Sequence, residues 1–257
     1  MRGIVASATN QGGNFMCGRY GRRSDKQYIA EHYAMRRKLV DLPPMPPGYN
    51  ITPGTFQPVV RVDEETSERE MVLMEWGLVP YWSNMHKMIS NCARDDKLTS
   101  SGAWFKPFQQ RRCLIPGEFF YEWEVLTPEE KRRKVTKPWA VALKDDRLFS
   151  FGGIWDRWKD RVTGIVLESF AIVTVDPNEI LEPFHNRCPL ILEPKDYSRW
   201  LAPAAPSHLP IDLVRTYPAE GMKAWRVAPL KDDGPQLLEP LKTPPDAMEI
   251  TPSLFPE

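Results

Sequence analysis

The sequence predicts an α+β fold, with one domain built on a mostly antiparallel, β-rich core and a few peripheral helices. Seven short apolar runs of strand length alternate with charged turns such as DEETSERE and KDDR. Helix signals are few, and the prolines are spread over connections rather than gathered in one linker. A length of 257 residues suits one domain of ordinary to large size.

The elements follow one another from the N-terminus. Residues 1–15 are polar and lack periodicity, so we treat residues 1–16 as a leader. The stretch SDKQYIAEHYAM, residues 24–35, begins with a Ser N-cap and has Tyr28, Ile29 and Tyr33 at helical spacing, which predicts a short amphipathic helix. The Pro-rich DLPPMPPGYN then ends that helix.

Strands are expected next, at FQPVVRV (56–62), MVLMEW (71–76), RRCLI (111–115), FFYEW (119–123), WAVAL (139–143), LFSFGGIW (148–155) and ESFAIVTV (168–175). A late helix is expected to start within KDYSRWL, residues 195–201. The chain after residue 202 is rich in Pro. We therefore expect a domain over residues 17–235 and a Pro-rich tail over residues 236–257.

Composition excludes several classes of protein. No apolar run approaches the roughly 18 to 20 residues of a membrane span, and the first fifteen residues lack the apolar region of a secretory signal, so we expect a cytoplasmic protein with no membrane partner. The four cysteines are scattered without a CxxC pair, so we expect no metal and no cofactor. A formal net charge of zero excludes a globally basic surface, although short clusters of Arg and Lys remain.

Cys17 directly follows an internal Met in the stretch NFMCGRYGRR. A mature chain that begins at Cys17 would carry a free amine and a thiol on adjacent carbons, which no other position in a protein offers. A buried structural Cys is the alternative.

Three further residues are candidates for chemistry. Glu122 lies in the aromatic strand FFYEW, where a carboxylate on an apolar face would suit a general acid or base with a raised pKa, and where a solvated sheet edge is the alternative. His185 lies in a Pro-bounded loop two residues before Arg187, so the pair could face one phosphate, or the His could be purely structural. Asn91 is the third candidate, and a turn Asn is its alternative.

Several separated motifs together resemble one family, the SOS response-associated peptidase (SRAP) or abasic site processing proteins. They are MCGRY (16–20), YNITPG (49–54), WGLVPYW (76–82), SNCAR (90–94), RRCLIP (111–116), FYEW (120–123) and HNRCP (185–189). The resemblance covers residue 17 to about residue 200. It implies a single SRAP domain and a DNA-damage-response enzyme that senses abasic sites in single-stranded DNA and links itself to them covalently, as a thiazolidine, through Cys17.

The resemblance also implies a role for each site residue. Glu122 would hold the Cys17 amine and move its protons, His185 would act as an acid on the sugar ring oxygen, and Asn91 would orient the sugar. DNA contacts would come from Arg19, Pro53, Trp82, Arg94, Thr174 and Arg187. We expect a monomer that associates with the nucleoid through DNA, with replication-fork proteins as further partners.

Two questions stay open at the level of sequence. The first is how Cys17 becomes the first residue. Either translation starts at Met16, which we favour because removal of an initiator Met before Cys is routine, or the protein removes its own leader by a peptidase-type hydrolysis. The function could also be that of a Cys-dependent peptidase or amidase with Cys17 as nucleophile, or that of a non-catalytic module that binds single-stranded nucleic acid. Such a module would still bind DNA after Cys17→Ala, and nothing covalent would form.

Overall fold

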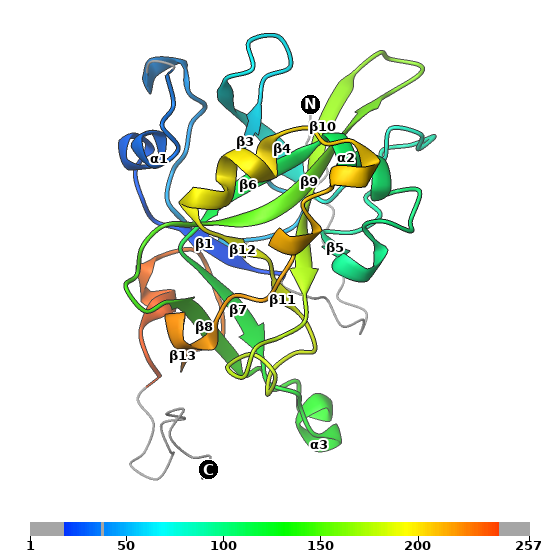
Figure 1. Ribbon diagram of the computed structural model, residues 1–257. Helices are drawn as coiled ribbons and strands as arrows, with labels where there is room; N and C mark the ends of the chain where they lie inside the picture. The colour runs from blue at the N-terminus through cyan, green and yellow to red at the C-terminus, as the bar shows by residue number, and fades with distance from the viewer. Residues whose placement is uncertain (1–17, 37–38, 242–257) are drawn as a thin grey trace.

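Five strands close into a barrel-like sheet, which occupies the upper part of Figure 1. The computed structural model describes residues 18–36 and 39–241. The strand order around the barrel is β10 (Val166–Val175), β4 (Arg69–Trp76), β3 (Phe56–Val62), β6 (Arg112–Gly117) and β9 (Phe149–Lys159), and β9 pairs back with β10. Three short strands extend this sheet: β5 (Cys92–Arg94) and β11 (Cys188–Pro189) on β10, and β12 (Ile191–Leu192) on β9.

Neighbouring strands of this sheet pair antiparallel, except that β10 runs parallel to β4 and to β5. The second sheet is antiparallel throughout, in the order β13 (Met222–Arg226), β8 (Pro138–Leu143), β7 (Phe119–Trp123), β1 (Tyr20–Arg22) and β2 (Gly48–Ile51). Only Glu118 separates β6 from β7, so the chain passes directly from one sheet to the other.

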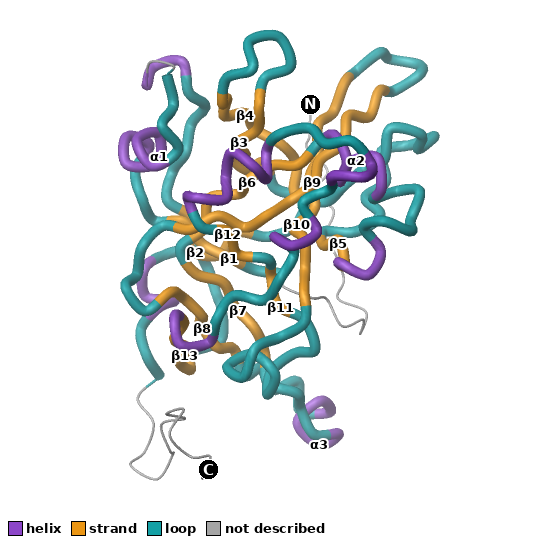
Figure 2. The backbone as a smooth tube through the Cα atoms, in the orientation of Figure 1, coloured by secondary structure: helices purple, strands orange, loops and turns teal. Residues whose placement is uncertain are grey.

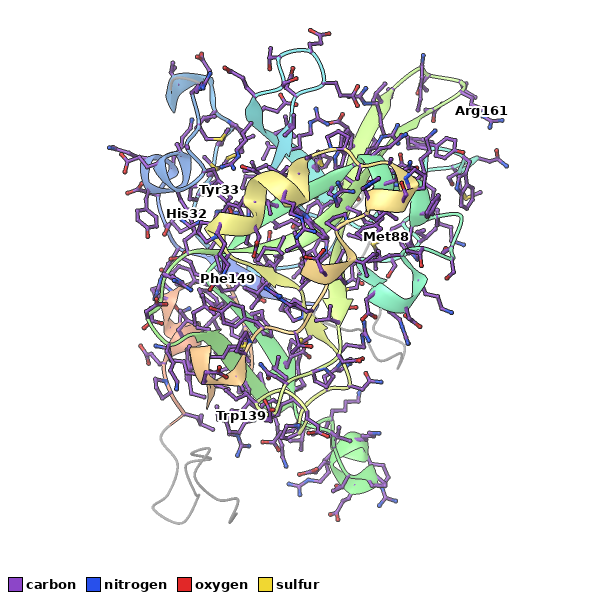
Figure 3. All side chains as sticks on the ribbon, in the orientation of Figure 1. His32, Tyr33, Met88, Trp139, Phe149 and Arg161 are labelled. Carbon is purple, nitrogen blue, oxygen red and sulfur yellow. The ribbon has the colours of Figure 1, made fainter. Side chains whose placement is uncertain are left out.

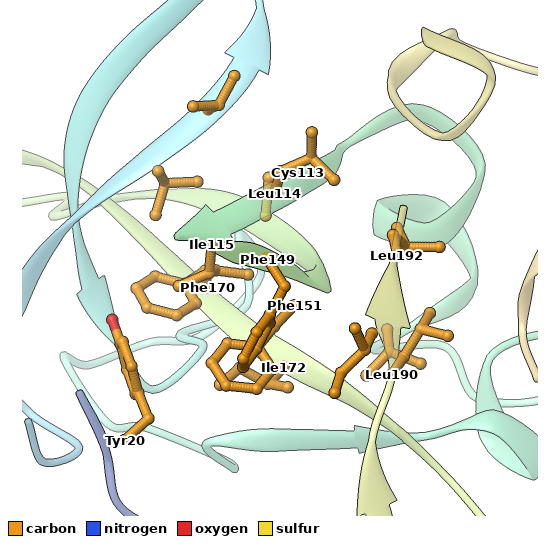
Figure 4. Packing of buried hydrophobic residues seen from close by; sticks show 14 of the residues in the cluster. Tyr20, Cys113, Leu114, Ile115, Phe149, Phe151, Phe170, Ile172, Leu190 and Leu192 are labelled. Carbon is orange, nitrogen blue, oxygen red and sulfur yellow. The ribbon is translucent and has the colours of Figure 1, made fainter. Parts of the chain in front are cut away.

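One hydrophobic core joins the two sheets. Tyr20 of β1 packs edge-on against Phe151 of β9 with ring centroids 5.4 Å apart, and Phe120 of β7 meets the same ring at 6.1 Å. Figure 4 shows Tyr20 and Phe151 among the buried side chains of this core. Because aromatic side chains from both sheets fill one continuous core, the two sheets fold as one α+β domain. The fold class expected from the sequence is therefore confirmed.

Helices are short and lie at the periphery, as Figure 2 shows. The α-helices are α1 (Lys26–His32), α2 (Phe105–Gln110), α3 (Pro128–Arg132) and α4 (Tyr197–Leu201). The 3-10 turns are η1 (Leu39–Asp41), η2 (Asp95–Lys97), η3 (Pro194–Asp196), η4 (Pro206–His208), η5 (Ile211–Leu213), η6 (Ala219–Gly221) and η7 (Pro235–Leu238). Within residues 18–36 and 39–241, none of the helices has the length and apolarity that crossing a bilayer requires.

Helix α1 begins one residue later than the sequence predicted. Asp25, not Ser24, is the N-cap, and its side chain accepts from the Tyr28 amide at 2.8 Å. The Ser24 hydroxyl donates instead to the buried Glu118 carboxylate at 2.9 Å, so it is not available to cap the helix. Ile29 and Tyr33 are buried as the helical spacing requires, and Figure 3 shows Tyr33 beside its neighbour His32.

Helix α3 projects from the connection between β7 and β8 at the lower end of Figure 1. A capping box between Thr127 and Glu130 starts it, and none of its residues is buried. The Glu124 amide donates to the Lys137 carbonyl at 3.1 Å, which closes the base of the connection. The segment that carries α3 therefore extends from the sheet beyond this backbone hydrogen bond.

The segment after β13 packs back on the second sheet. Leu237 of η7 is buried in a second apolar cluster with Phe119 and Tyr121, and the Trp225 indole donates to the Leu238 carbonyl at 2.9 Å. Residues 236–241, which we expected in a Pro-rich tail, are thus part of the packed structure as far as it is described.

Candidate active site

Glu122 is a buried carboxylate on an inner strand. Its strand β7 lies between β8 and β1, and Glu122 is only 2% exposed. Phe120 points into the main core, while Phe119 and Tyr121 point into the second cluster, so apolar side chains cover both faces of the strand. The solvated sheet edge that the sequence left open for Glu122 is therefore wrong, and the buried interpretation is confirmed.

Burial and the negative charge of Glu122 both raise the pKa of two thiols that lie on different strands. Burial raises the pKa of Cys92 on β5, and Glu122 raises it further. Burial also raises the pKa of Cys188 on β11 to about 12, where Arg187 acts in the opposite direction and Glu122 adds to the rise. Glu122 therefore lies close enough to Cys92 and Cys188 to affect the pKa of both, so β7 lies near β5 and β11 at this point.

The three cysteines within the described part of the chain are poor nucleophiles. All are buried, and the pKa of the Cys113 thiol is also raised by burial. Because the thiolate is the nucleophilic form, thiols with such raised pKa values are inert near neutral pH. Cys17, the predicted nucleophile, lies outside the described residues.

Strand β1 leads from the chain next to Cys17 into the site. The Tyr121 amide donates to the Arg19 carbonyl at 3.0 Å, and the β1–β7 register pairs Tyr20 with Phe120. Extending this register by two residues places Gly18 opposite Glu122. At Gly21 a Cβ atom would lie 2.0 Å from the Phe119 ring, so only glycine allows β1 to approach β7 this closely.

Asn91 is fixed through its backbone. Its carbonyl accepts from the Trp76 indole and from the Ile172 amide, both at 3.0 Å, and the residue is nearly buried. The following strand β5 then pairs with β10, with Arg94 opposite Thr174. Trp76, the first residue of the WGLVPYW motif, thus holds Asn91 of the SNCAR motif in place.

Arg187 is buried and fully engaged by acceptors of the protein. Its guanidinium donates to Asp176 at 2.7 Å, to Asp95 and to the Thr174 carbonyl, and the residue is 4% exposed. This differs from the phosphate contact expected of Arg187, because two carboxylates and a carbonyl already occupy the guanidinium. Only its Nε, like the fully buried Thr174 hydroxyl, lacks a hydrogen-bond partner among the described residues.

His185 is held in one orientation by the same loop. Its Nδ1 accepts from the Arg187 amide at 3.1 Å, so in the neutral ring the proton sits on Nε2, which can donate. Burial lowers the pKa of His185, and the positive charge of Arg187 lowers it further. The loop is also held near Glu122, because Phe184 packs on Trp139 with ring centroids 4.8 Å apart and Trp139 pairs with Glu122 across β7 and β8.

Trp82 lies on a loop that leaves the barrel and returns just before Asn91. A bridge between Leu78 and Ser90 closes the loop, and Gly77 enters it with a φ of +134°, a conformation that favours glycine. The buried Asp156 carboxylate accepts from the Tyr81 amide at 2.8 Å and pairs with Arg111. The loop is thus anchored to β9, while the Trp82 ring is 49% exposed.

The structure brings most of the predicted residues into one region. Asn91, Arg94, Thr174, His185 and Arg187 meet where β5, β10 and β11 pair. Glu122 lies on β7, and Arg19 directly precedes β1, the strand that pairs with β7. Pro53 lies in the turn between β2 and β3, where the Gly54 amide donates to the carbonyl of Trp76, the residue whose indole donates to Asn91. Trp82 is likewise on the loop that follows β4.

Sequence reasoning missed the residues that hold the site residues in place. They are Asn50 beside Arg19, Asp95 and Asp176 beside Arg187, and Asp156 under the loop of Trp82. Asn50 is part of the YNITPG motif and Asp95 follows SNCAR directly, so their positions in the motifs were a usable signal. Nothing local to Asp156 or Asp176 points to the partners they find.

An open depression of about 450 Å³ lies away from this region, lined by residues that include Arg23, Tyr28 and Glu118. The Glu118 carboxylate there accepts from the amides of Arg23 and Ser24 and from the Ser24 hydroxyl. Because these contacts join β1 to the start of α1, we assign Glu118 a structural role.

Comparison with known proteins gives a consistent result. The model of the SOS response associated peptidase (SRAP) family matches residues 16–230. Abasic site processing protein YoqW of Bacillus subtilis strain 168 is 32% identical over 234 residues, which cover 87% of this chain and 99% of that protein. Abasic site processing protein HMCES of Gallus gallus is 29% identical over 226 residues, 76% of this chain and 67% of that protein.

A crystal structure of a Bacteroides thetaiotaomicron protein has the same fold. It matches with a TM-score of 0.75 at 21% identity, and the match covers 88% of this chain and 100% of that chain. At this level of identity the likeness concerns the fold alone.

Proposed function

Because the chain belongs to the SOS response associated peptidase family, we propose that it recognises abasic sites in single-stranded DNA and captures them covalently through Cys17. The names of the relatives YoqW and HMCES support the abasic site as substrate. The observation that carries the proposal is the burial of Glu122, at 2% exposure, opposite Gly18. Gly18 is bonded to Cys17, and consecutive α-carbons are about 3.8 Å apart, so a chain that begins at Cys17 would start one residue from the position opposite the buried carboxylate.

The proposed chemistry needs a chain that begins at Cys17. An abasic deoxyribose is a hemiacetal in equilibrium with its open-chain aldehyde. The Cys17 amine attacks the aldehyde carbon, and loss of water gives an imine. The thiol then adds across the C=N bond, forming a C–S bond while the nitrogen gains a proton, and a five-membered thiazolidine closes. An internal Cys17 has no free amine and cannot react in this way.

Two side chains would move the protons of this reaction. The α-amine has a pKa near 7.7 to 8.0, so part of it is protonated at neutral pH, and the adjacent Glu122 can take up that proton. His185 presents Nε2 as its donor, and the protonated ring can give a proton to the sugar ring oxygen as the ring opens. Asn91 would orient the sugar.

The orientation of His185 also bears on the competing function. A Cys-dependent peptidase needs a His nitrogen with a free lone pair facing the nucleophile. In this chain Nδ1 is occupied by the Arg187 amide and Nε2 carries the proton, so the ring is arranged as a donor. This favours capture of a sugar over hydrolysis of a separate amide substrate.

DNA would be bound by half-exposed cations and an exposed aromatic ring. We assign phosphate contacts to Arg19 and Arg94 and base stacking to Trp82, which suits a single strand because unpaired bases expose their faces. Pro53 would border the DNA path, whereas Thr174 is fully buried and so differs from the DNA contact expected from the sequence. We propose that the protein acts as a monomer at the nucleoid, with replication-fork proteins as partners.

The leader is the remaining part of the proposal. The family match starts at Met16, one residue before Cys17, which supports initiation at Met16 followed by loss of that Met. The alternative is hydrolysis of the Met16–Cys17 peptide bond by the protein itself. Both routes give a chain that starts at Cys17. The intact mass of untagged protein from its native host distinguishes that chain from one that retains residues 1–16.

The test of capture uses protein that begins at Cys17 and a labelled single strand with one abasic site. A denaturing gel should show a slower band that Cys17→Ser does not form. A matched strand with a tetrahydrofuran in place of the abasic sugar has no aldehyde and should give no adduct. Absence of a denaturation-resistant band with the true abasic strand would refute the proposal.

A further inference from the structure

We propose that Asn50 and the turn at Asp232 and Asp233 are positioning residues for Arg19, which they hold ready to bind a DNA phosphate. This inference rests on the proposed function, in which Arg19 contacts the DNA backbone. The turn lies beyond residues 16–230, the range that the family model matches. The segment after the matched range would thus contribute to the DNA site of this chain.

A side-chain amide links Arg19 to the turn. The Arg19 guanidinium donates from Nη1 to Asn50 Oδ1 at 2.5 Å, and Asn50 Nδ2 donates to the Asp232 carbonyl at 2.8 Å. The two ends of an amide differ, since one only accepts and the other only donates. A flipped Asn50 would set its NH₂ against the guanidinium and its oxygen against the carbonyl, so the Asp232 carbonyl fixes which end faces Arg19.

The turn itself is also bound to Tyr49, the residue before Asn50. The Tyr49 amide donates to Asp233 Oδ1 at 2.5 Å, and the Tyr121 hydroxyl donates to the Tyr49 carbonyl at 2.9 Å. Asp232 has a φ of +61°, in the left-handed region that Asp and Asn enter more readily than most residues. The turn leads into η7, which the buried Leu237 holds against the sheet.

This arrangement affects how Arg19 can bind. Arg19 is only half-buried, and a free Arg side chain loses much rotamer freedom when it binds an anion. One hydrogen bond to Asn50 restricts the side chain yet leaves most of the five N–H donors for a phosphate. A preorganised side chain loses less freedom on binding, so the link to Asn50 should raise affinity without touching DNA.

The test is a double-mutant cycle on binding of an undamaged labelled single strand, which needs no covalent chemistry. Asn50→Ala should raise Kd about three- to tenfold, the range expected for releasing one immobilised side chain. In an Arg19→Ala background the same substitution should change Kd less than twofold. Arg19→Ala should also lower the slope of log Kd against log salt by about 0.7, the value for one phosphate contact on a single strand.

Two further variants complete the design. Asp233→Ala removes the acceptor of the Tyr49 amide and makes no contact with Arg19, so it should weaken binding only when Arg19 is present. It tests the same link if Asn50→Ala fails to fold. Arg36→Ala removes an exposed guanidinium that pairs with Glu68 on the surface, and it reports the effect of charge loss alone.

The outcomes separate this inference from the proposed function. Equal weakening by Asn50→Ala with and without Arg19, or no weakening at all, would overturn the positioning role while leaving DNA capture intact. An Arg19→Ala protein with unchanged affinity and salt slope would overturn the phosphate contact and the positioning role together. Loss of adduct formation by wild-type protein would instead count against the proposed function.

Discussion

Replacing Arg187 by Met tests whether this residue supports the fold or binds DNA. The substitution keeps an unbranched apolar stem and removes the guanidinium that donates to Asp95, Asp176 and the Thr174 carbonyl. Breaking a buried ion pair costs about 3 to 5 kcal/mol when the remaining charge stays buried. Here the carboxylates can regain water, since the Asp176 side chain is 82% exposed and that of Asp95 is 26% exposed.

We therefore expect Arg187→Met to lower the free energy of unfolding by about 2 to 3 kcal/mol, which is less than the cost of leaving a charge buried and lies in the upper part of the range for a lost hydrogen bond to a charged group. For a domain of this size that corresponds to a decrease of about 4 to 12 °C in Tm. Urea denaturation followed by intrinsic fluorescence measures the free energy, and an unchanged m-value would show that the unfolded state is unaffected.

Arg94→Met is the matched control. Arg94 is exposed and pairs with the equally exposed Asp96, so its loss should leave stability unchanged. It should instead lower the salt dependence of single-strand binding by about 0.7 in slope, which Arg187→Met should not. Unchanged stability of Arg187→Met together with a reduced salt slope would refute this reasoning and restore the phosphate contact expected from the sequence.

The remaining predictions concern Glu122, His185 and Asp156. Glu122→Gln keeps the shape but not the charge, so capture of abasic DNA and reversal of the adduct should both slow about 100-fold or more in single-turnover assays; normal rates would exclude a proton-transfer role. The pKa of His185 is lowered, so its protonated form gains weight only below about pH 6.5, and the ratio of wild-type to His185→Gln capture rates should rise as pH falls below that value; a constant ratio from pH 5 to 8 would contradict an acid role. Asp156→Ala leaves Arg111 without its buried partner, so it should destabilise the protein by about 3 kcal/mol and speed hydrogen exchange at the Tyr81 amide, whereas unchanged exchange would show that the loop does not depend on Asp156.

The strands of the barrel could be predicted because each is a long apolar run. Apart from Arg111 and Leu148, which just precede β6 and β9, all residues of the seven expected runs lie in strands, and the predicted bounds of β3 and β7 match the structure. The missed strands β1, β2, β5, β11, β12 and β13 are two to five residues long, and all except β12 contain Gly, Pro or charged residues. Their strand geometry comes from pairing with neighbours distant in sequence, so a local pattern cannot reveal it.

The candidate site shows the same division. Glu122 stood out as a carboxylate among aromatic residues, but its burial depends on β1 and β8, which flank it from opposite sides. For Arg187 the motif gave the position and not the partners, because Asp95 lies 92 residues away in the sequence. The Ser24 cap expected from the sequence was wrong because the distant Glu118 binds its hydroxyl, and Asp25 caps the helix instead.

Helix α3 offers a place to attach a label or an affinity handle. Any fusion ahead of Cys17 would block the amine on which the proposed chemistry depends, so a handle must go elsewhere. Residues 131–134, at the end of this helix and just after it, are exposed, and α3 has no buried side chain. The Glu124–Lys137 backbone bond closes the base of the connection that carries them. A fluorophore or a short peptide inserted there would report on the protein while leaving its first residue free.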